Sequence, residues 1–428
     1  MAQLMAACLA DAGAERDHLA AILPGGGADW IPPRCGNLGC DVLAWARSGL
    51  MHLTGLPDEA PLAPAAPVLS RVSVLASAIT AMTAAAGTEV LLDVPHLLAG
   101  RSRLQGWHRR GRISANGSCR LLQAADGWLA VNLARPDDVR SVPAVLGAPV
   151  PGDAWTALTE HAGTRPAAEV AGAAQLVGIP AAVLGSSAAT EPVRVSRLGS
   201  AGARGAPLVL DLSAMWAGPV CARILRQAGW QVLKVEDVRR PDGARSGPPE
   251  FYAELHAGIP TVRLDFSSAD GRAELRRLAG QAAVVIESSR PRALRNLGLL
   301  AEEWLAAAAG RVWVSITGYG RADPQQRVAF GDDAAVAGGL IARTADGSPV
   351  FCGDAIADPL TGILSGAAAL AAAADGGGAL LDVAMSGVCA DLAREPAAPL
   401  HTHTVEPATG GTGWVARHGD ETAAVLRW

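Results

Sequence analysis

The chain has 428 residues, half of them hydrophobic, and a formal net charge of −5. This composition excludes a disordered protein, and the lack of excess basic charge argues against a nucleic-acid partner. The length allows two domains, or one large α/β core with an insertion.

Cysteine and hydropathy patterns narrow the class of protein further. The seven cysteines are scattered, and none shows the spacing of a structural zinc site, so we expect no metal. An odd number of cysteines without a signal peptide predicts a cytoplasmic location. The most continuous apolar stretch, residues 362–374, is too short to cross a bilayer, so we expect no membrane partner.

The second half of the chain alternates strand and helix patterns, beginning with a βαβ unit at Val209–Glu236 that contains the only lysine, Lys234. Strands are predicted at Leu208–Leu212, Gln231–Val235, Thr261–Leu264, Ala283–Ile286 and Val312–Ile316. Helices are predicted at Pro219–Ala228, Ser268–Ala279, Ala301–Ala309, Asp332–Ile341 and Asp358–Ala374. The alternation predicts an α/β fold, a Rossmann-like, mostly parallel sheet flanked by helices, with a second, smaller α/β domain.

The first half is less regular. It predicts helices at Ser70–Ala86, Ala154–Ala162 and Ala167–Leu176, a strand at Glu89–Val94 and a hairpin at Asp126-Gly127. We expect domains at 1–185 and 207–394, a linker at 186–206 and an irregular tail at 395–428. The sequence LLDV occurs at Leu91–Val94 and again at Leu380–Val383, each time after an Ala-rich helix, which suggests an internal duplication.

Three segments are candidates for ligand binding. The glycine-rich segment 199–205 precedes its strand, whereas a dinucleotide fingerprint lies between strand and helix, so we exclude that class of site. Arg290 and Gly318-Tyr319-Gly320 each follow a predicted strand, where open α/β sheets bind ligands. A solvated loop at Arg290 and a simple glycine turn at Tyr319 are the alternative interpretations.

The acidic residues offer the clearest chemistry. Asp358 directly precedes an apolar helix, and it suits an N-cap with Pro359 at the first helical position. The same carboxylate suits a nucleophile or base influenced by the helix N-terminus, and both roles are compatible. We find no Ser/His/Asp, Cys/His or Walker arrangement in the sequence.

Taken together, the motifs of residues 208–388 resemble those of the family III CoA-transferases, which include formyl-CoA and carnitine CoA-transferases and α-methylacyl-CoA racemase. The matching motifs are VLDLSAMWAGPVCARILRQAGWQVLKVE (209–236), AGIPTVRLDFSSADGR (257–272), ESSRP (287–291), LGL (297–299), SITGYG (315–320), GDD (331–333) and IADPLTG (356–362).

The resemblance implies covalent catalysis by Asp358. Its carboxylate would attack an acyl-CoA to give a mixed anhydride, CoA would return to form an enzyme–CoA thioester, and a carboxylic acid would collect the CoA. The residues implied to line the CoA channel are Trp216, Ala217, Gly218, Leu264, Ser288 and Tyr319, with Lys234 and Arg290 as partners of the CoA phosphates. Gly318, Gly320 and Asp332 are implied on the substrate side. The resemblance also implies a homodimer, and whether the two halves of the chain pair within one chain or across an interlocked dimer, as in the family, stays open.

Departures from the family pattern leave two alternatives. Asp332 stands where racemases carry His, which disfavours a His–Asp racemase, although a racemase or isomerase using Asp358 and Asp332 remains a second hypothesis. A non-catalytic CoA-ester-binding paralogue is the third. The first half resembles the family's later half, so the order looks permuted, and the position equivalent to Asp358 falls near residues 69–71, which include no carboxylate.

Overall fold

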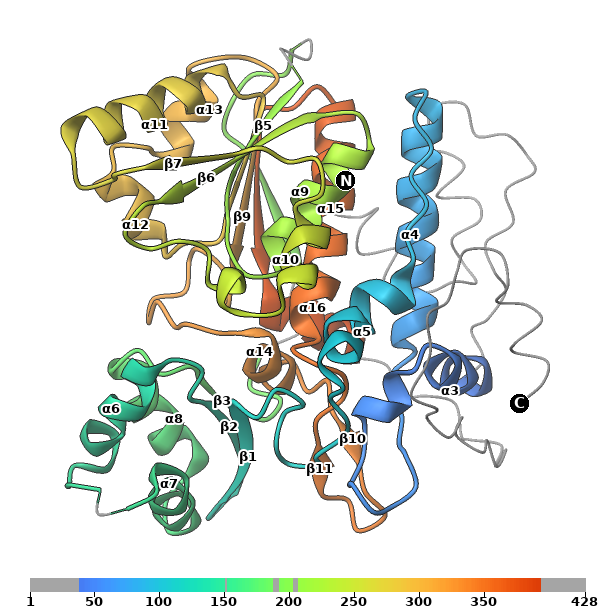
Figure 1. The fold of residues 1–428 in the computed structure, drawn as a ribbon, viewed down its shortest axis with the longest axis vertical. Helices are drawn as coiled ribbons and strands as arrows, with labels where there is room; N and C mark the ends of the chain where they lie inside the picture. Colours follow the sequence, from blue (N-terminus) through green and yellow to red (C-terminus); the bar gives the residue numbers. More distant parts are fainter. Residues whose placement is uncertain (1–37, 151, 188–191, 203–206, 394–428) are drawn as a thin grey trace.

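The computed structural model describes residues 38–150, 152–187, 192–202 and 207–393. The predicted tail at 395–428 lies outside them. Figure 1 shows two lobes, a sheet lobe with a large central sheet and a small lobe below it. The small lobe comprises residues 119–183.

A seven-stranded sheet, in the order β4-β12-β9-β8-β5-β6-β7, forms the centre of the sheet lobe. Its strands are β4 (Val193–Arg197), β5 (Leu208–Leu212), β6 (Gln231–Asp237), β7 (Thr261–Leu264), β8 (Val284–Glu287), β9 (Val312–Thr317) and β12 (Ala379–Ala384). All neighbours are parallel except β4, which pairs antiparallel with β12. The α/β fold and five of the strands are therefore confirmed, with bounds that shift by at most two residues.

Helices cover both faces of this sheet because successive strand residues point to opposite sides. In β5, Val209 packs in the core beneath α9 and α15, while Leu210 packs in the core beneath α11 and α13. The helices of the lobe are α9 (Ala217–Gln227), α10 (Pro249–Leu255), α11 (Ala269–Gln281), α12 (Pro291–Asn296), α13 (Ala301–Ala306), α14 (Gly331–Ala337), α15 (Ala357–Ala374) and α16 (Met385–Ala393), with the 3-10 helix η2 (Gly243–Ser246).

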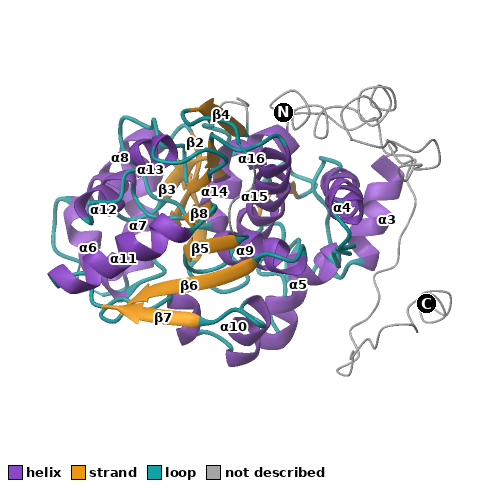
Figure 2. Ribbon diagram, turned by 90° about the horizontal axis from the view of Figure 1, so that it is seen from above, coloured by secondary structure: helices purple, strands orange, loops and turns teal. Residues whose placement is uncertain are grey.

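The first described segment packs outside these helices instead of forming a separate unit. It contains α3 (Leu38–Arg47), η1 (Leu50–Leu53), α4 (Val68–Ala85) and α5 (Val94–Gln105). Figure 2 shows α4 beyond α15 and α3 beyond α4. The side chains of this first segment share one hydrophobic core with the sheet. The expected domain 1–185 is thus divided between two cores, although its outer boundaries stay a prediction.

The small lobe has its own core. It contains β1 (Cys119–Ala124), β2 (Gly127–Asn132), β3 (Ala181–Val183), α6 (Pro136–Leu146), α7 (Ala154–Gly163) and α8 (Ala167–Leu176). The hairpin predicted at Asp126-Gly127 is confirmed, since Ala124 pairs with Gly127 across a two-residue turn. The other face of β1 packs against Val336 and Phe351, the latter next to the hairpin β10 (Ala342–Arg343) and β11 (Pro349–Val350).

Three local predictions are wrong. Residues 89–93 form no strand: Leu91 is 72% exposed, and Asp93 instead caps α5 through the His96 N–H at 2.9 Å. The expected linker at 186–206 contains the edge strand β4, whose Val193 is buried against the core. The helix predicted at Asp332–Ile341 ends at Ala337, before the Gly338-Gly339 pair.

Two helices of the described residues, α4 and α15, are long and apolar enough to cross a membrane by length and composition. The protein buries 78% of the most apolar window of α15 and 44% of that of α4. The whole of α15 has 18 residues, more than the apolar stretch considered in the sequence, and its composition is accounted for by its place in the core.

Candidate active site

Asp358 lies in the first turn of α15, beside the start of α14. The helix N-cap is Ile356 and not Asp358, so the predicted capping role is wrong. A side chain at Gly331 would contact the Ala355 carbonyl and come within 2.5 Å of Asp358 Oδ2. Glycine at position 331 therefore allows the two helix starts to approach, and its backbone N–H lowers the pKa of Asp358.

The turn before Asp358 has an unusual backbone. Gly353 and Ala355 have φ angles of 75° and 43°, and the second is a conformation that residues with a Cβ seldom adopt. The Ala355 N–H donates to Asp332 Oδ1 at 2.8 Å, and the Ala355 carbonyl accepts from the Asp358 N–H at 2.9 Å. Asp332 also accepts from Asn116 Nδ2 at 3.1 Å.

Three carboxyl groups meet at this turn. Burial raises the pKa of Asp358 to about 7, and the charges of Asp332 and Asp354 raise it while that of Arg101 lowers it. Burial and the charge of Asp354 raise the pKa of Asp332 to about 6. Asp354 and Asp332 are buried, whereas Asp358 is partly exposed. Asp358 is thus the accessible carboxyl of the three, and it can switch between charged and neutral forms near pH 7.

Close packing brings the predicted CoA-channel turn to Asp358. A side chain at Gly362 would come within 2.5 Å of the Ala217 carbonyl, and one at Gly366 within 2.9 Å of Ile224. These two glycines, one and two turns beyond Asp358, let α9 lie directly against α15. Trp216, the N-cap of α9, is buried and packs edge-on to Phe251, with 5.1 Å between the ring centroids.

Two further residues of the predicted CoA channel lie at the carboxyl edge of the sheet. Leu264 ends β7, and Ser288, which is exposed, follows β8. Ser288 Oγ accepts from the Ala214 N–H at 3.1 Å and so ties its loop to the turn before α9. Gly218 allows that turn to fold tightly, since a side chain there would collide with Ser213.

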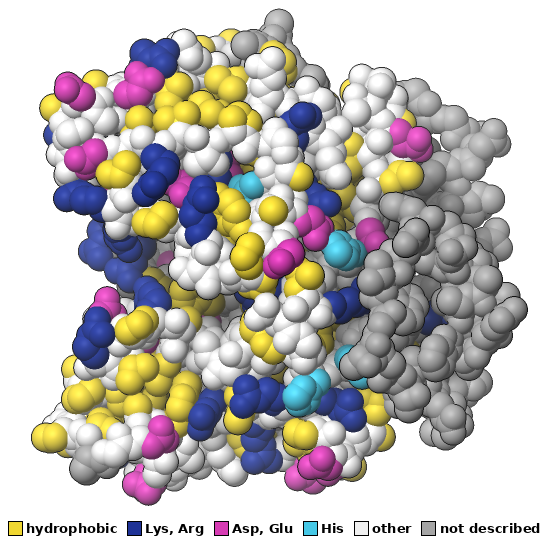
Figure 3. Space-filling model, viewed as in Figure 1, with side chains coloured by type: hydrophobic (Ala, Val, Ile, Leu, Met, Phe, Trp, Pro, Cys, Tyr) yellow, Lys and Arg dark blue, Asp and Glu magenta, His cyan; other side chains and the backbone are white. Residues whose placement is uncertain are grey.

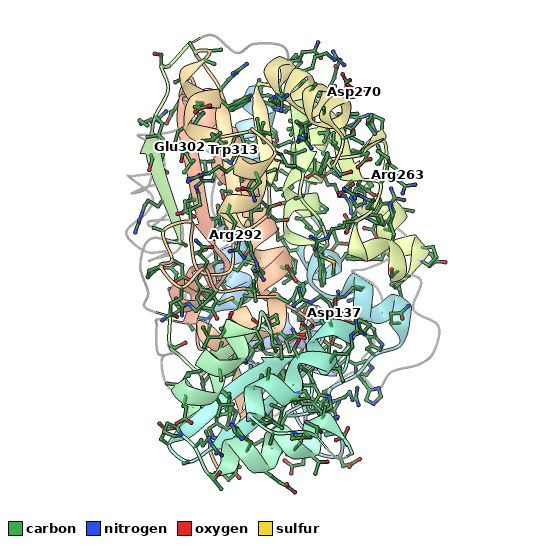
Figure 4. All side chains as sticks on the ribbon, turned by 90° about the vertical axis from the view of Figure 1, so that its left-hand side faces the viewer. Asp137, Arg263, Asp270, Arg292, Glu302 and Trp313 are labelled. Atoms are coloured by element: carbon green, nitrogen blue, oxygen red, sulfur yellow. The ribbon has the colours of Figure 1, made fainter. Side chains whose placement is uncertain are left out.

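Arg290 belongs to a cluster of positive charge. It is exposed, precedes α12, and partial burial together with Arg292, Arg135 and Arg240 lowers its pKa. Arg135 comes from the small lobe and the other three from the sheet lobe. Figure 3 shows basic side chains gathered on the left of the molecule, where the outline is notched between the lobes. In Figure 4, Arg292 lies between Trp313 of the sheet and Asp137 of α6.

Lys234 has a structural role instead of the predicted contact with CoA phosphates. Its side chain is completely buried, 2.9 Å from Asp242 Oδ2 and 3.6 Å from Asp211 Oδ2, and it donates to the Ser213 carbonyl at 3.0 Å. Burial lowers the pKa of Lys234, but the two carboxylates outweigh this effect and raise it. Because the Lys234 ammonium is buried and paired with carboxylates, it cannot reach a phosphate at the surface.

The predicted Gly-Tyr-Gly segment is packed more tightly than an open ligand loop. A side chain at Gly318 would meet Ala329 Cβ at 2.7 Å, and Gly320 has a φ of 91° next to Asp382. Tyr319 stacks against the Arg327 guanidinium at 3.8 Å, and burial raises the pKa of its hydroxyl. The Gly-Tyr-Gly segment follows the end of β9. The charge of Asp333, which lies on α14, also raises the pKa of Tyr319.

Residues from the first half of the chain complete the site, and few sequence features pointed to them. Arg101 and Ser102 of α5 both bind Asp354, and Asn116 binds Asp332. Asn116 and Arg101 both lie outside the motifs of residues 208–388 that predicted the site. Among the described residues, no group of three or more His, Cys, Asp or Glu side chains is arranged to hold a metal ion.

The fold and this acidic site agree with a known class of transferase. Residues 207–416, just under half of the chain, match the model of CoA-transferase family III. The family predicted from the sequence motifs is thereby confirmed.

Individual relatives match over a similar length. The chain is 31% identical over 199 residues to an acyl-CoA transferase of Fusarium pseudograminearum, covering 41% of this chain and 44% of that protein. It is 33% identical over 181 residues to a succinate–glutarate CoA-transferase of Agrobacterium fabrum, covering 38% and 45%. A solved CAIB/BAIF family protein from Brucella suis matches at 27% identity over 46% of this chain and 55% of that one, with a TM-score of 0.39. The chain thus spans less than half the length of the two relatives.

Proposed function

We propose that the protein transfers CoA from an acyl-CoA thioester to a carboxylic acid, with Asp358 as the nucleophile. The observation that carries the proposal is the placement of Asp358. It is a partly exposed carboxyl at a helix start, beside two buried carboxyls, with a pKa raised to about 7. A carboxylate with a raised pKa is more nucleophilic than an ordinary one and is still substantially ionised at neutral pH.

The proposed reaction passes through two covalent forms of the enzyme, an anhydride and a thioester, and so conserves the free energy of the thioester bond. The Asp358 carboxylate attacks the thioester carbonyl, and CoA leaves as the thiolate with an aspartyl–acyl anhydride behind it. The thiolate then attacks the aspartyl carbonyl, which releases the first carboxylate and leaves an aspartyl–CoA thioester. The acceptor carboxylate repeats these steps in reverse, and Asp358 is regenerated.

The CoA moiety is proposed to lie along the carboxyl edge of the sheet. Trp216, Ala217 and Gly218 bring the α9 turn next to Asp358, while Leu264, Ser288 and Tyr319 lie at the ends of β7, β8 and β9. The arginine cluster around Arg290 supplies the positive charge that phosphates require. Lys234 is left out of this proposal because it is buried.

The racemase alternative is less well supported. Asp332 would be the second base, but its two oxygens already accept hydrogen bonds from Asn116 and from the Ala355 N–H. The Asp332 carboxylate therefore stabilises the turn before Asp358 and has no oxygen free of these hydrogen bonds to act as a base. The non-catalytic alternative makes a different prediction, tight binding of CoA esters without exchange of CoA. The predicted homodimer and cytoplasmic location stay predictions.

Trapping with hydroxylamine tests the proposal. The protein is incubated with succinyl-CoA and either glutarate or succinate, since two relatives carry these acids in their names. Hydroxylamine should convert the anhydride and the thioester to a hydroxamate at Asp358, detectable by peptide mass spectrometry, and labelled CoA should enter the thioester pool.

The matched variants are Asp358→Asn and Asp375→Asn, which alter opposite ends of α15. The first should lose the hydroxamate and at least 1,000-fold in rate, on the order of the loss of other nucleophiles, and the second should keep both. Full transfer activity in Asp358→Asn would refute the mechanism. Deuterium uptake at the acyl α-carbon without CoA exchange would favour the racemase, and binding with neither reaction would favour the non-catalytic protein.

A further inference from the structure

Arg101 occupies an aromatic box next to the site. It lies on α5, outside the stretch that matches the family model. Its guanidinium stacks 4.6 Å from the centre of the Trp216 ring, and the rings of Trp107 and Phe251 lie at 5.5 and 5.9 Å. Such faces attract a guanidinium and shield it from water. Arg101 is therefore held against the same tryptophan that caps α9.

The guanidinium makes a two-pronged contact with Asp354. Arg101 Nε donates to Oδ2 at 2.8 Å and Nη2 to Oδ1 at 2.6 Å, and Ser102 Oγ donates to Oδ2 at 2.8 Å. The Asp354 side chain has no exposed surface. Two hydrogen bonds from a planar guanidinium fix both the direction and the distance of the carboxylate. The contact therefore orients the backbone at residue 354.

The oriented backbone leads directly to Asp358. Asp354 lies between Gly353 and Ala355, and the positive φ angle of Ala355 needs outside support to persist. The Ala355 N–H is held by Asp332, and its carbonyl accepts the Asp358 N–H. Arg101 thus acts on Asp358 through Asp354 and Ala355, without a direct hydrogen bond to it.

The charge of Arg101 acts on the whole carboxyl group. Burial lowers the pKa of Arg101, yet Asp354, Asp332 and Asp358 together raise it above its ordinary value. The reciprocal effect lowers the pKa values of Asp332 and Asp358. Without this cation, three neighbouring carboxyls would oppose one another's ionisation.

We propose that Arg101 is a positioning residue that holds the turn 353–358 in its strained form and keeps Asp358 ionised for attack. The role belongs to a segment outside the family match, so this enzyme completes its site with a part of the chain that precedes the small lobe. The inference rests on the proposed function of Asp358 as nucleophile.

The test compares Arg101→Gln, Arg101→Lys and the control Arg103→Gln. Arg103 is an exposed residue on the same helix, bound to the Ser48 carbonyl. Two measurements are made on each protein: the pH dependence of kcat for CoA transfer, and the 13C NMR titration of the Asp358 carboxyl, assigned with Asp358→Asn. The charged and titratable groups around Asp358 are Arg101, Asp332, Asp354 and the Cys389 thiol, and all but the mutated one stay in place.

Loss of the cation in Arg101→Gln should move the acid limb of kcat and the NMR midpoint upward by about 1–3 pH units, the usual effect of a nearby opposite charge. At pH 7 kcat should then fall about 5-fold or more, because less of the Asp358 carboxyl is ionised. Arg101→Lys keeps the charge and loses the fork, so its acid limb should stay close to that of the parent while kcat falls. If Arg101→Gln does not fold, an unchanged kcat in Arg101→Lys would by itself overturn the proposal.

A folded Arg101→Gln protein with an unmoved NMR midpoint overturns the inference, whatever its activity. Arg103→Gln should match the parent in both measurements. The NMR titration is independent of turnover, so it separates this inference from the proposed function. An absence of CoA transfer in the parent protein refutes the function alone, and the midpoint shift in Arg101→Gln then still reports the effect of Arg101 on Asp358.

Discussion

Asp358 and Lys234 show how differently a charged residue behaves according to its neighbours. Asp358 is partly exposed and lies beside two carboxyls and an arginine, and its pKa is raised to about 7. Lys234 is enclosed by Asp211 and Asp242, which leaves it permanently charged. Only the first arrangement is useful for a reaction that needs a reactive carboxylate.

Replacing Lys234 tests its structural role. Lys234→Met should leave Asp211 and Asp242 as unpaired charges in the interior, a change that costs about 3–5 kcal/mol in other proteins. We expect a loss of that order in the free energy of unfolding, measured by urea denaturation. Arg277→Met, which breaks an exposed pair with Glu274, is the control and should have little effect. If Lys234→Met keeps the stability of the parent but raises KM for acyl-CoA, Lys234 contacts the substrate after all.

At the scale of elements, the contact between α9 and α15 sets the distance from Trp216 to Asp358. Gly362→Ala would place a methyl group 2.5 Å from the Ala217 carbonyl and 2.6 Å from Val220 Cβ, so the helices must separate. We expect a loss of about 1–3 kcal/mol in stability and a fall in kcat, because the α9 turn moves away from Asp358. Urea denaturation and steady-state kinetics measure the two effects.

Gly172→Ala is the matched control for this prediction. Gly172 is exposed inside α8, and a side chain there would meet no atom within 4 Å. It should stabilise the protein by about 0.5–1 kcal/mol through helix propensity and leave kcat unchanged. Equal stability of Gly362→Ala and Gly172→Ala would show that the helix contact is not as close as the structure has it.

The two LLDV segments each follow a long helix, but only the second LLDV segment forms a strand. Helices α4 and α15 both have 18 residues, and Leu69 is the second residue of one as Asp358 is the second residue of the other. After α15 the repeat forms β12, whereas after α4 the same sequence is an exposed segment that caps α5. Residues 91–94 pair with no strand in the part of the chain that the structure describes, and Leu69 stands where α15 has Asp358.

At the scale of the molecule, hydrogen bonds from Asn116 and Asn132 join the first half of the chain to α14. Asn132, the last residue of β2, donates to Asp333 Oδ1 at 3.1 Å, and both side chains are buried. Neither Asn132 Oδ1 nor Asp333 Oδ2 has a hydrogen-bond partner among the described residues. A proton on Asp333 Oδ2 would satisfy both, and burial accordingly raises the pKa of Asp333 to about 8.

This contact makes stability depend on pH. The pKa of Asp333 rises from 3.8 to about 8 on folding, so the folded protein keeps a proton that the unfolded chain releases. Its contribution to stability is therefore full below about pH 4 and is lost as the pH rises toward 8. The raised pKa values of Asp332 and Asp358 act in the same direction.

Asp333→Asn should weaken this dependence, because an amide is neutral at every pH and still donates to Asn132. Urea denaturation at pH 5 and pH 8 should show a smaller loss of stability in the variant than in the parent. Asp137→Asn, at an exposed site of the small lobe, should keep the parent's dependence. Identical pH dependence in Asp333→Asn and the parent would contradict a protonated Asp333.

Sequence periodicity was sufficient for most of the fold, and a local motif was sufficient for the proposed nucleophile. The strand Thr261–Leu264 and the helix Ala167–Leu176 match their predicted bounds because local apolar patterns and turn residues define them. Asp358 was identified by a local motif. Pairing partners are not local, which is why β4 was missed and a strand was wrongly expected at Glu89–Val94.

The sequence by itself determined the family, the parallel sheet and the position of Asp358, since each depends on residues close together in the chain. Only the tertiary structure decided what surrounds that carboxyl. It placed Arg101 and Asn116 at the site from more than 200 residues away, and it enclosed Lys234 between two carboxylates. The charge state of a side chain depends on burial and on neighbouring charges, and these are properties of the folded chain.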